Sequence, residues 1–431
     1  MSGRLFSFYG DDFTGSTDAL EALAANAVPS VLFLDPLFLD QPEERMLDRF
    51  GDCRAIGVAG ESRSRSPEWM SENLPEIFRA LRRLGAPLCQ YKVCSTFDSS
   101  PQFGSIGRAL EIGQQVFGNP YVPIVVAAPH LQRYVLFGNL FAAGNGAIHR
   151  IDRHPTMRRH PVTPMDEGDL RLHLARQTGR RIALLDILAL RGIDPAGELD
   201  RVLAETPDVV LFDGLDQASL LVTGRLLCGA RFAVGSSGLT YALIEYWRST
   251  GLIPTEPTPG ELKPVERLIA ISGSCSPVTE GQIRRAVSDG FRGIRIDPSA
   301  PELALDEGLA ALREGQSVAM YSALGPQDCA GSFRGEKPRG EELGRRLGLL
   351  LRDLLVRSGV RRVVIAGGDT SSHAVRQLGI DALTYAGPLA PGVPLCRGHS
   401  ADPRMDGLEL ALKGGQVGAE NFFETALRGQ P

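Results

Sequence analysis

The chain has 431 residues, of which 43% are hydrophobic and 23% are charged, and its formal net charge is −5. This length exceeds what one hydrophobic core usually supports, and the composition excludes a disordered chain. A negative net charge gives no attraction to nucleic acid or to an anionic membrane, and no apolar run approaches the roughly 20 residues of a membrane span. We therefore predict two domains and a small-molecule partner, with no nucleic-acid and no membrane partner.

Alternating apolar runs and helical patterns fill the first 130 residues at the spacing of β-α-β units. This spacing predicts a mainly parallel sheet flanked by helices on both faces, an α/β fold. Strands are expected near 5–9, 30–34, 54–58, 88–93, 122–127, 182–187, 209–212 and 231–234, and helices near 17–26, 67–84 and 105–117. The proline-rich segment 253–264 predicts a linker between an N-terminal domain, 1–252, and a C-terminal domain, 265–431.

After the linker, the order of apolar strand, short Gly/Ser-rich loop and helix occurs three times. The strands 267–271, 362–366 and 408–412 lead into SGSCSP, GGDTSS and KGGQVG. Loops at the carboxyl ends of parallel strands gather along one edge of a sheet, where helix N-termini present free N–H groups. Glycine lets the backbone approach an anion closely, and Ser or Thr donates a hydroxyl. The pattern predicts a cradle for nucleotide phosphates.

Charged side chains follow three of the expected N-terminal strands. Asp11 and Asp12 follow the first strand. A turn or a helix cap accounts for one acidic residue at this place, whereas two adjacent acidic residues favour binding of substrate hydroxyls or a general base. Arg63 lies in a segment typical of helix initiation, but an arginine there is also a candidate for holding a carboxylate. Lys92 is one of only four lysines against 42 arginines, and it precedes hydroxyl side chains and Asp98. This third strand end favours a small, polar, anionic substrate.

Absent motifs narrow the class further. The sequence has no P-loop, no Gly-x-Gly-x-x-Gly and no protein-kinase set, and the segment 235–238 lacks the spacing of a serine-hydrolase elbow. Histidines and cysteines show no metal-ligand spacing and no C-x-x-C pair, and the first residues lack the features of a signal peptide. We expect a cytoplasmic protein with reduced thiols and no metal site of its own.

Taken in order along the chain, these segments resemble the four-carbon acid sugar kinases. The family opening Asp-Asp-Phe-Thr-Gly-Ala-Thr-Asp is matched by Asp11–Asp18, with Ser16 in place of alanine, and Lys-x-Cys-Ser-Thr-Phe-Asp-Ser by Lys92–Ser99. The other family motifs are matched at His160–Met165, Gly235–Leu239, Ser272–Ser276, Gly367–Ser371 and Lys413–Gly418. The sequence departs from the family at Asp369, where glutamate is usual, and at Gly414, Gln416 and Val417.

The resemblance implies a sugar-acid domain followed by an ATP domain, with phosphoryl transfer in the cleft between them and Mg²⁺ carried by ATP. The catalytic candidates are Asp11, Asp12 and Lys92, and either aspartate is left open as the base. The predicted substrate-binding residues are Asp11, Arg63, Lys92, Val93, Cys94 and Ser95. The predicted nucleotide-binding residues are Ser274, Gly368, Asp369, Thr370, Ser371 and Gly415.

Several alternatives stay open at this stage. The acceptor is a tetronate, its 3-oxo form, or a branched acid such as 3-oxo-isoapionate, and the protein is a monomer or a homodimer. One rival function is a sugar-acid dehydrogenase, which the missing dinucleotide motif disfavours. Another is a non-catalytic sensor of sugar acid or nucleotide, which would bind its ligands without turnover.

Overall fold

The computed structural model describes residues 3–36, 49–144, 146–160, 162–256, 260, 262–297, 300–331 and 340–429. The chain forms two compact units: an N-terminal unit of residues 1–30 and 36–258, and a C-terminal unit of residues 31–35 and 259–431. The change of unit after residue 258 lies inside the segment expected as a linker, while the precise domain limits stay a prediction. Residues 31–35 differ from the expectation: the sequence predicts them in the N-terminal domain, whereas the structure places them in the C-terminal unit.

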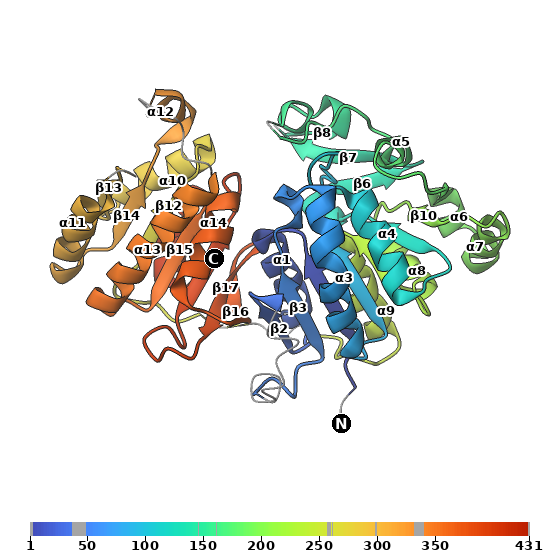
Figure 1. The fold of residues 1–431 in the computed structure, drawn as a ribbon, viewed down its shortest axis with the longest axis horizontal. Helices are drawn as coiled ribbons and strands as arrows, with labels where there is room; N and C mark the ends of the chain where they lie inside the picture. Colours follow the sequence, from blue (N-terminus) through green and yellow to red (C-terminus); the bar gives the residue numbers. More distant parts are fainter. Residues whose placement is uncertain are drawn as a thin grey trace. The chain divides into compact units, whose positions relative to one another are not determined.

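Within the described residues, the N-terminal unit is built on a sheet of seven parallel strands, whose arrangement Figure 1 shows. Their spatial order is β3 (Ala55–Ala59), β1 (Phe6–Gly10), β4 (Leu88–Lys92), β11 (Phe232–Gly235), β5 (Val122–Val125), β10 (Val209–Phe212) and β9 (Ile182–Leu185). The central strands are buried throughout, as expected for a sheet covered on both faces. The predicted mainly parallel α/β fold is confirmed.

Helices cover both faces of this sheet. They are α1 (Phe13–Ala24), α3 (Pro67–Arg83), α4 (Ile106–Phe117), α5 (Leu170–Ala175), α6 (Ile187–Arg191), α7 (Pro195–Ala204), α8 (Gln217–Leu226) and α9 (Ser237–Ser249), with short 3-10 turns η2 (Ser62–Ser64), η3 (Pro129–Leu131), η4 (Ile151–Arg153) and η5 (Met157–Arg159). Helix α3 packs against α4, as Figure 1 shows, and α9 packs against both α1 and α8. Helix α1 starts earlier than predicted because Asp12 caps it by accepting a hydrogen bond from the Gly15 amide.

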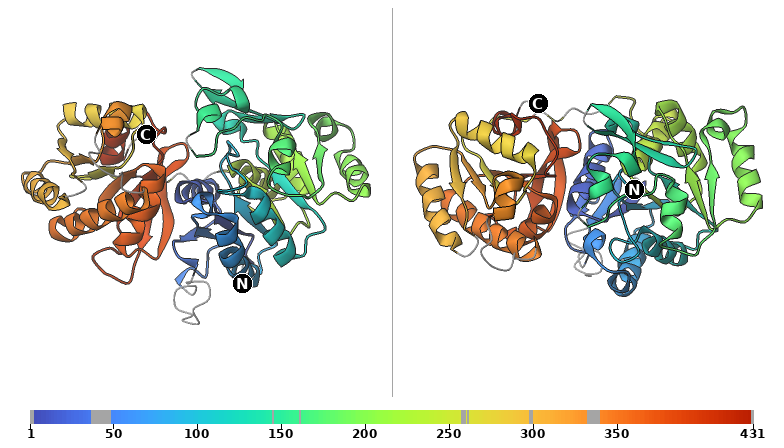
Figure 2. Two further views of the ribbon diagram at one scale, coloured as in Figure 1. Left: turned by 45° about the horizontal axis from the view of Figure 1, so that its top comes forward. Right: turned by 90° about the horizontal axis from the view of Figure 1, so that it is seen from above.

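A second, antiparallel sheet lies at the carboxyl edge of the first. Its strands are β6 (Arg133–Leu136), β7 (Asn139–Gly144) and β8 (Ala147–Arg150), drawn in green-blue at the top of the unit in Figure 1 and in the left view of Figure 2. Backbone hydrogen bonds between Ala128 and Arg133 tie β6 to the segment that follows β5. The sequence pattern did not predict these strands, since they are short and only partly buried.

The part of the C-terminal unit that the structure describes has a mixed sheet of eight strands. Their order is β13 (Arg292–Arg295), β14 (Val318–Tyr321), β12 (Ile269–Ser272), β15 (Arg362–Ala366), β18 (Glu409–Lys413), β17 (Val393–His399), β16 (Ala382–Ala390) and β2 (Ser30–Phe33). The first five are parallel, whereas β17, β16 and β2 pair antiparallel. Pairing with β16 explains why residues 31–35 belong to this unit although α1 precedes them in the chain.

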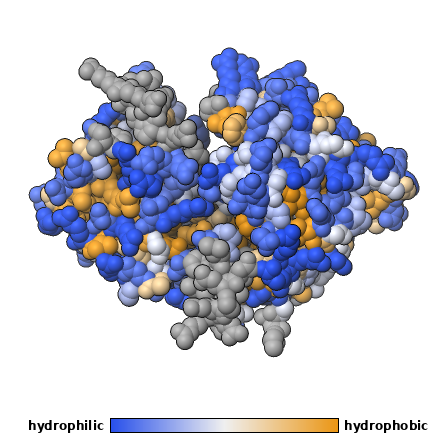
Figure 3. Space-filling view, in the orientation of Figure 1, coloured by the Kyte–Doolittle hydropathy of each residue, from blue (hydrophilic) through white to orange (hydrophobic). Residues whose placement is uncertain are grey.

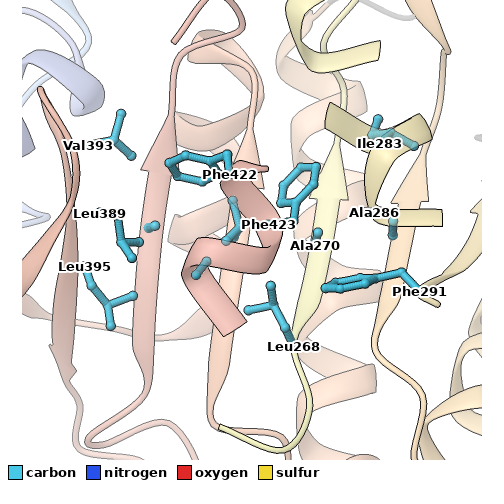
Figure 4. Packing of buried hydrophobic residues seen from close by; sticks show 14 residues of the cluster. Leu268, Ala270, Ile283, Ala286, Phe291, Leu389, Val393, Leu395, Phe422 and Phe423 are labelled. Atoms are coloured by element: carbon cyan, nitrogen blue, oxygen red, sulfur yellow. The ribbon is translucent and has the colours of Figure 1, made fainter. Parts of the chain in front are cut away.

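The core of the C-terminal unit lies between this sheet and its helices. These are α10 (Pro277–Ser288), α11 (Pro301–Arg313), α12 (Gly325–Gly331), α13 (Gly340–Ser358), α14 (Gly368–Val375) and α15 (Phe422–Arg428), with the turn η6 (Arg376–Leu378). Figure 4 shows Phe422 and Phe423 of α15 packed with Leu268, Ala270 and neighbouring apolar side chains. Burying such aromatic side chains contributes strongly to stability, so α15 fastens the end of the chain to the sheet.

The visible surface is mainly hydrophilic, with separate apolar patches (Figure 3). Within the described part of the chain, no helix is both long enough and apolar enough to cross a membrane. Nor do the described side chains include a group of three or more His, Cys, Asp or Glu residues that could hold a metal ion.

Candidate active site

Charged residues meet where three neighbouring parallel strands of the N-terminal unit end. Asp11 and Asp12 follow β1, Arg63 lies in η2 after β3, and Lys92 is the last residue of β4. Backbone hydrogen bonds join these ends: the Asp11 amide donates to the Lys92 carbonyl at 2.9 Å, and the Arg63 amide donates to the Asp11 carbonyl at 3.1 Å. The sheet thus brings together side chains that are about 80 residues apart in sequence.

Asp11 is the least satisfied of these groups. Its side chain is only 4% exposed, and its Oδ1 has no hydrogen-bond partner in the structure. Burial raises the pKa of the Asp11 carboxyl to about 7, against the lowering effect of Arg63 and Lys92, and the nearby Asp12 adds to the rise. A carboxyl with a pKa near neutrality exchanges a proton readily at physiological pH, which is the requirement for a general base.

Arg63 links two carboxylates. Its Nη1 donates to Asp12 Oδ2 and its Nη2 to Asp98 Oδ1, both at 2.7 Å. Asp98 also accepts from Thr96 at 2.5 Å and from Thr163 at 3.1 Å. Although burial opposes ionisation, the charge and hydrogen bonds of Arg63 hold the pKa of Asp98 at about 2. Asp98 therefore stays a carboxylate and fixes the orientation of the guanidinium.

Lys92 is buried and paired as well. Its Nζ lies 3.0 Å from Asp18 Oδ2 on α1 and donates to the Val93 carbonyl at 3.2 Å. Burial by itself would lower the pKa of Lys92, but the charge and hydrogen bond of Asp18, together with the nearby Cys94 and Asp11, outweigh burial and the pKa is raised. His130 lies in range of the same pair: burial, helped by Lys92, lowers its pKa, and Asp18 opposes this change. A positive charge is thereby maintained at the end of β4.

The residues after Lys92 contribute in different ways. The Val93 side chain is buried and its amide bonds to the Gly235 carbonyl at 2.9 Å, whereas Cys94 and Ser95 are partly exposed. Thr96 donates to Cys94 Sγ at 3.0 Å. Cys94 and Ser95 are thus the predicted residues of this segment whose side chains are accessible to a ligand.

In the C-terminal unit, the three Gly/Ser-rich loops also come together. The Gly273 amide donates to the Ala366 carbonyl at 3.1 Å, and the Gly367 amide donates to the Lys413 carbonyl at 2.8 Å. Thr279 of α10 donates to the Gly415 carbonyl at 2.8 Å. The ends of β12, β15 and β18 are adjacent, so that the loops after them form one surface, as the spacing predicted.

Three glycines contribute no side chains to this surface. Gly367 adopts a φ of 117°, which favours glycine, and a Cβ at Gly368 would meet nothing within 4 Å. A Cβ at Gly415 would lie 2.5 Å from the hydroxyl of Ser274. A side chain at Gly368 would occupy open space, whereas one at Gly415 would press against the first loop.

The remaining predicted nucleotide residues differ in their accessibility. Ser274 is nearly buried, and its hydroxyl accepts from the Ser276 amide at 3.2 Å. The Ser371 hydroxyl is buried and donates to the Ile365 carbonyl at 3.1 Å, so it is turned toward β15. The side chains of Asp369 and Thr370 lie outside the described part of the structure.

Lys413 is the last residue of β18 and directly precedes the third loop. Its Nζ donates to Thr279 Oγ1, to the Gly414 carbonyl and to the Val417 carbonyl at 3.2, 2.9 and 3.0 Å. Burial lowers the pKa of this lysine to about 8. No carboxylate hydrogen-bonds to Lys413 among the described residues, so its charge is stabilised by neutral oxygens and by the ring of Phe422, whose centroid lies 5.8 Å from Nζ.

Sequence reasoning missed several contributors to these sites. Asp18, His130 and Thr163 were not singled out as candidates, because helix and loop residues of their type are common and only the fold brings them to Lys92 or Asp98. The expectation of reduced thiols is wrong at Cys275, which is disulfide-bonded. Cys53, Cys89, Cys94, Cys228 and Cys396 are free.

Domain models identify the class of protein. Residues 6–243 match the model of a sugar-binding N-terminal domain, and residues 269–423 match that of a nucleotide-binding C-terminal domain. The chain belongs to the four-carbon acid sugar kinase family, whose members are phosphotransferases.

Individual relatives agree with this class. The chain is 48% identical to a 3-oxo-isoapionate kinase of Paraburkholderia graminis, over 100% of this chain and 95% of that protein. It is 31% identical to a 3-oxo-tetronate kinase of Cupriavidus necator, over 98% and 96% of the two chains. Among solved structures, a Salmonella typhimurium LT2 protein described as a tRNA synthase is similar over the full length of both chains, with 25% identity and a TM-score of 0.81. A Haemophilus influenzae protein, 22% identical over 97% and 98% of the two chains, has the same fold with a TM-score of 0.73.

Proposed function

We propose that the protein transfers the γ-phosphoryl group of ATP to a hydroxyl of a short sugar acid, with 3-oxo-isoapionate as the preferred acceptor. The choice of acceptor is supported by the 48% identity to a 3-oxo-isoapionate kinase over the whole chain, compared with 31% to a 3-oxo-tetronate kinase. Since both relatives phosphorylate 3-oxo acids, 3-oxo-tetronate is the second candidate.

The observation that carries the chemistry is the state of Asp11. A buried carboxyl whose Oδ1 has no partner, and whose pKa lies near 7, is suited to accept a proton from a bound hydroxyl. Asp12 is a weaker candidate, because its oxygens already accept hydrogen bonds from Gly15 and Arg63. We therefore assign the general base to Asp11 and a positioning role to Asp12.

The proposed phosphoryl transfer forms one bond to phosphorus and breaks another. An acceptor oxygen forms a bond to the γ-phosphorus, the bond from that phosphorus to the β,γ-bridging oxygen breaks, and ADP leaves. The hydroxyl proton passes to Asp11 Oδ1 and then to solvent. Such transfers depend mainly on alignment and charge neutralisation, and little on covalent catalysis.

The C-terminal unit has features suited to binding a nucleoside triphosphate. Gly368 has open space around it, Gly415 faces the Ser274 loop, and Lys413 supplies a buried positive charge without a carboxylate partner. We propose that the three loops hold the phosphates. Mg²⁺ would be bound with the phosphates and would neutralise part of their charge, as it does in other phosphoryl transfers.

An assay of ADP release over a panel of C4 to C6 sugar acids tests the function. We expect turnover with 3-oxo-isoapionate at the highest kcat/KM, weaker turnover with 3-oxo-tetronate, and no absorbance change with NAD or NADP. A protein that binds both ligands without releasing ADP would be a sensor, and this outcome would overturn the proposal.

A further inference from the structure

The acceptor's carboxylate needs a cation, and the two cations already considered are largely engaged. Both terminal nitrogens of Arg63 contact carboxylates, Asp12 and Asp98. The ammonium of Lys92 is paired with Asp18. Because each positive charge is already matched by acidic side chains, neither offers an anionic ligand a net uncompensated charge.

A third cation, Arg133, lies at the same edge of the sheet. It is the first residue of β6, and its backbone exchanges hydrogen bonds of 2.9 and 3.1 Å with Ala128, just beyond the carboxyl end of β5. Its charge interacts with Cys94, which also interacts with Arg63 and Lys92. The segment Val93–Ser95, predicted to face the acceptor, therefore lies in range of all three cations.

Arg133 differs from the other two because no acidic side chain among the residues that the structure describes pairs with it. Its Nη1 donates to backbone carbonyls only, those of Leu131, Gln132 and Ala143 at 2.9, 3.3 and 3.5 Å. Its Nε is buried without an acceptor, and its Nη2 makes no hydrogen bond to the described residues. The N–H donors of Nη2 are therefore the ones available to an oxygen of a ligand.

No acidic residue in the described part of the chain adds a compensating negative charge to Arg133. His154, which follows η4, is a further titratable group in range: burial lowers its pKa, and Arg133 lowers it further. Burial also lowers the pKa of Arg133 itself, while Cys94 opposes this change. The guanidinium stays charged in any case, because an arginine is not deprotonated in proteins.

We propose that Arg133 binds the carboxylate of the acceptor through Nη2, and that this contact makes the enzyme select sugar acids over neutral sugars. Nη2 presents two N–H donors at the open end of the planar guanidinium fork, and these donors suit a carboxylate oxygen. Arg63 then acts by holding Asp12 and Asp98 in place. This inference rests on the proposed sugar-acid kinase activity.

The test compares Arg133→Met with Arg150→Met, a matched control in which an arginine of strand β8 in the same sheet is already paired with Asp152 at 2.7 Å. Binding and turnover are measured with 3-oxo-isoapionate and with its primary amide. We expect Arg133→Met to raise the KM for the acid at least about 30-fold, the range for truncating one partner of a buried charge pair. The KM for ATP and the KM for the amide should not change, and Arg150→Met should behave as the wild type.

A structural role would give a different pattern. If Arg133 only braced β6, the acid and the amide would be affected equally, and this result would overturn the inference. Arg133→Lys retains the charge without the fork, so we expect an intermediate KM for the acid. Unchanged calorimetric binding of the acid by folded Arg133→Met, with an active wild type, would overturn the inference alone.

A second measurement avoids the variants. Butanedione modifies accessible arginines, and peptide mass spectrometry follows Arg133 in the wild-type protein. Added acid, but not the amide, should slow modification of Arg133, and equal rates would overturn the inference even if Arg133→Met does not fold. A wild type that neither binds nor phosphorylates any sugar acid would overturn the proposed function and this inference with it.

Discussion

Lys92 and Lys413 end parallel strands in the two units, and both are almost completely buried, at 2% and 0% exposure. Lys92 meets the carboxylate of Asp18 at 3.0 Å, which raises its pKa. Lys413 meets a hydroxyl and two carbonyls, and burial lowers its pKa to about 8. The pKa values of two lysines in similar positions at strand ends are therefore shifted in opposite directions.

This difference follows the charge of the ligand proposed for each unit. A triphosphate carries enough negative charge to compensate a buried lysine that lacks a protein partner. The N-terminal site must instead orient a hydroxyl and keep a base near neutrality, and its alternating Asp and Arg or Lys side chains hold each other in position. A buried positive charge without an acidic partner thus marks the region that we propose binds an anion.

The largest expected effect comes from removing the base. Asp11→Asn should lower kcat/KM for the acceptor by about 10² to 10⁴-fold, the range for loss of a general base, with ATP affinity unchanged by calorimetry. Because the folded-state pKa is raised, ionisation of the carboxyl lowers stability as the pH rises from about 3.8 to about 7, and the full loss is present above pH 7. The variant should therefore melt no lower than the wild type at pH 8. Activity near the wild-type value would remove Asp11 from the reaction.

A reciprocal pair of variants tests the comparison directly. Lys92→Met should reduce acceptor kcat/KM by roughly 100-fold, since it leaves Asp18 unpaired, and should not alter ATP affinity. Lys413→Met should weaken ATP binding by roughly tenfold or more, and should not alter acceptor binding. Calorimetry of both ligands on both folded variants measures the split. Loss of ATP binding in Lys92→Met would contradict the assignment of ligands to units.

The pH dependence of turnover reports on Asp11. Only the carboxylate accepts a proton, so kcat/KM should rise about tenfold per pH unit below the pKa of about 7 and level off above it. The residual activity of Asp11→Asn should lack this limb. A wild-type profile that is flat between about pH 5 and pH 7 would contradict the assignment.

Replacing Gly368 tests whether the three Gly/Ser-rich loops bind the phosphates. Since a Cβ there meets nothing within 4 Å, Gly368→Val should fold normally and obstruct only the ligand. We expect ATP affinity to fall by roughly tenfold, about the cost of one hydrogen bond to a charged group. Gly179→Val, also in open space but in the other unit, is the matched control and should bind ATP as the wild type does.

The smallest expected effect is on the pH dependence of ATP binding. Lys413 loses its proton above about pH 8, and a bound triphosphate should retain that proton, so affinity should decline a few-fold between about pH 8 and pH 9. Lys413→Met should abolish the decline. Equal pH dependence in both proteins would show that the buried lysine does not sense the phosphates.

Sequence patterns predicted the parallel sheets because their signal is local. Buried strands such as Val122–Val125 are short apolar runs, and Gly/Ser-rich loops follow β12, β15 and β18 directly in the chain. The antiparallel strands β16 and β17 escaped prediction, since Pro388 and Pro394 lie within them and a proline usually argues against a strand.

The sequence by itself determined which residues stand at the strand ends, and hence that Asp11, Arg63 and Lys92 would meet at one edge. Only the tertiary structure decided how their charges are matched, because ion pairs join residues far apart in the chain: Arg63 with Asp98, and Lys92 with Asp18. The same holds for Arg133, whose lack of an acidic partner depends on every segment folded around it. Position along a strand is a local property, whereas the charge state of a buried group is set by all of its neighbours.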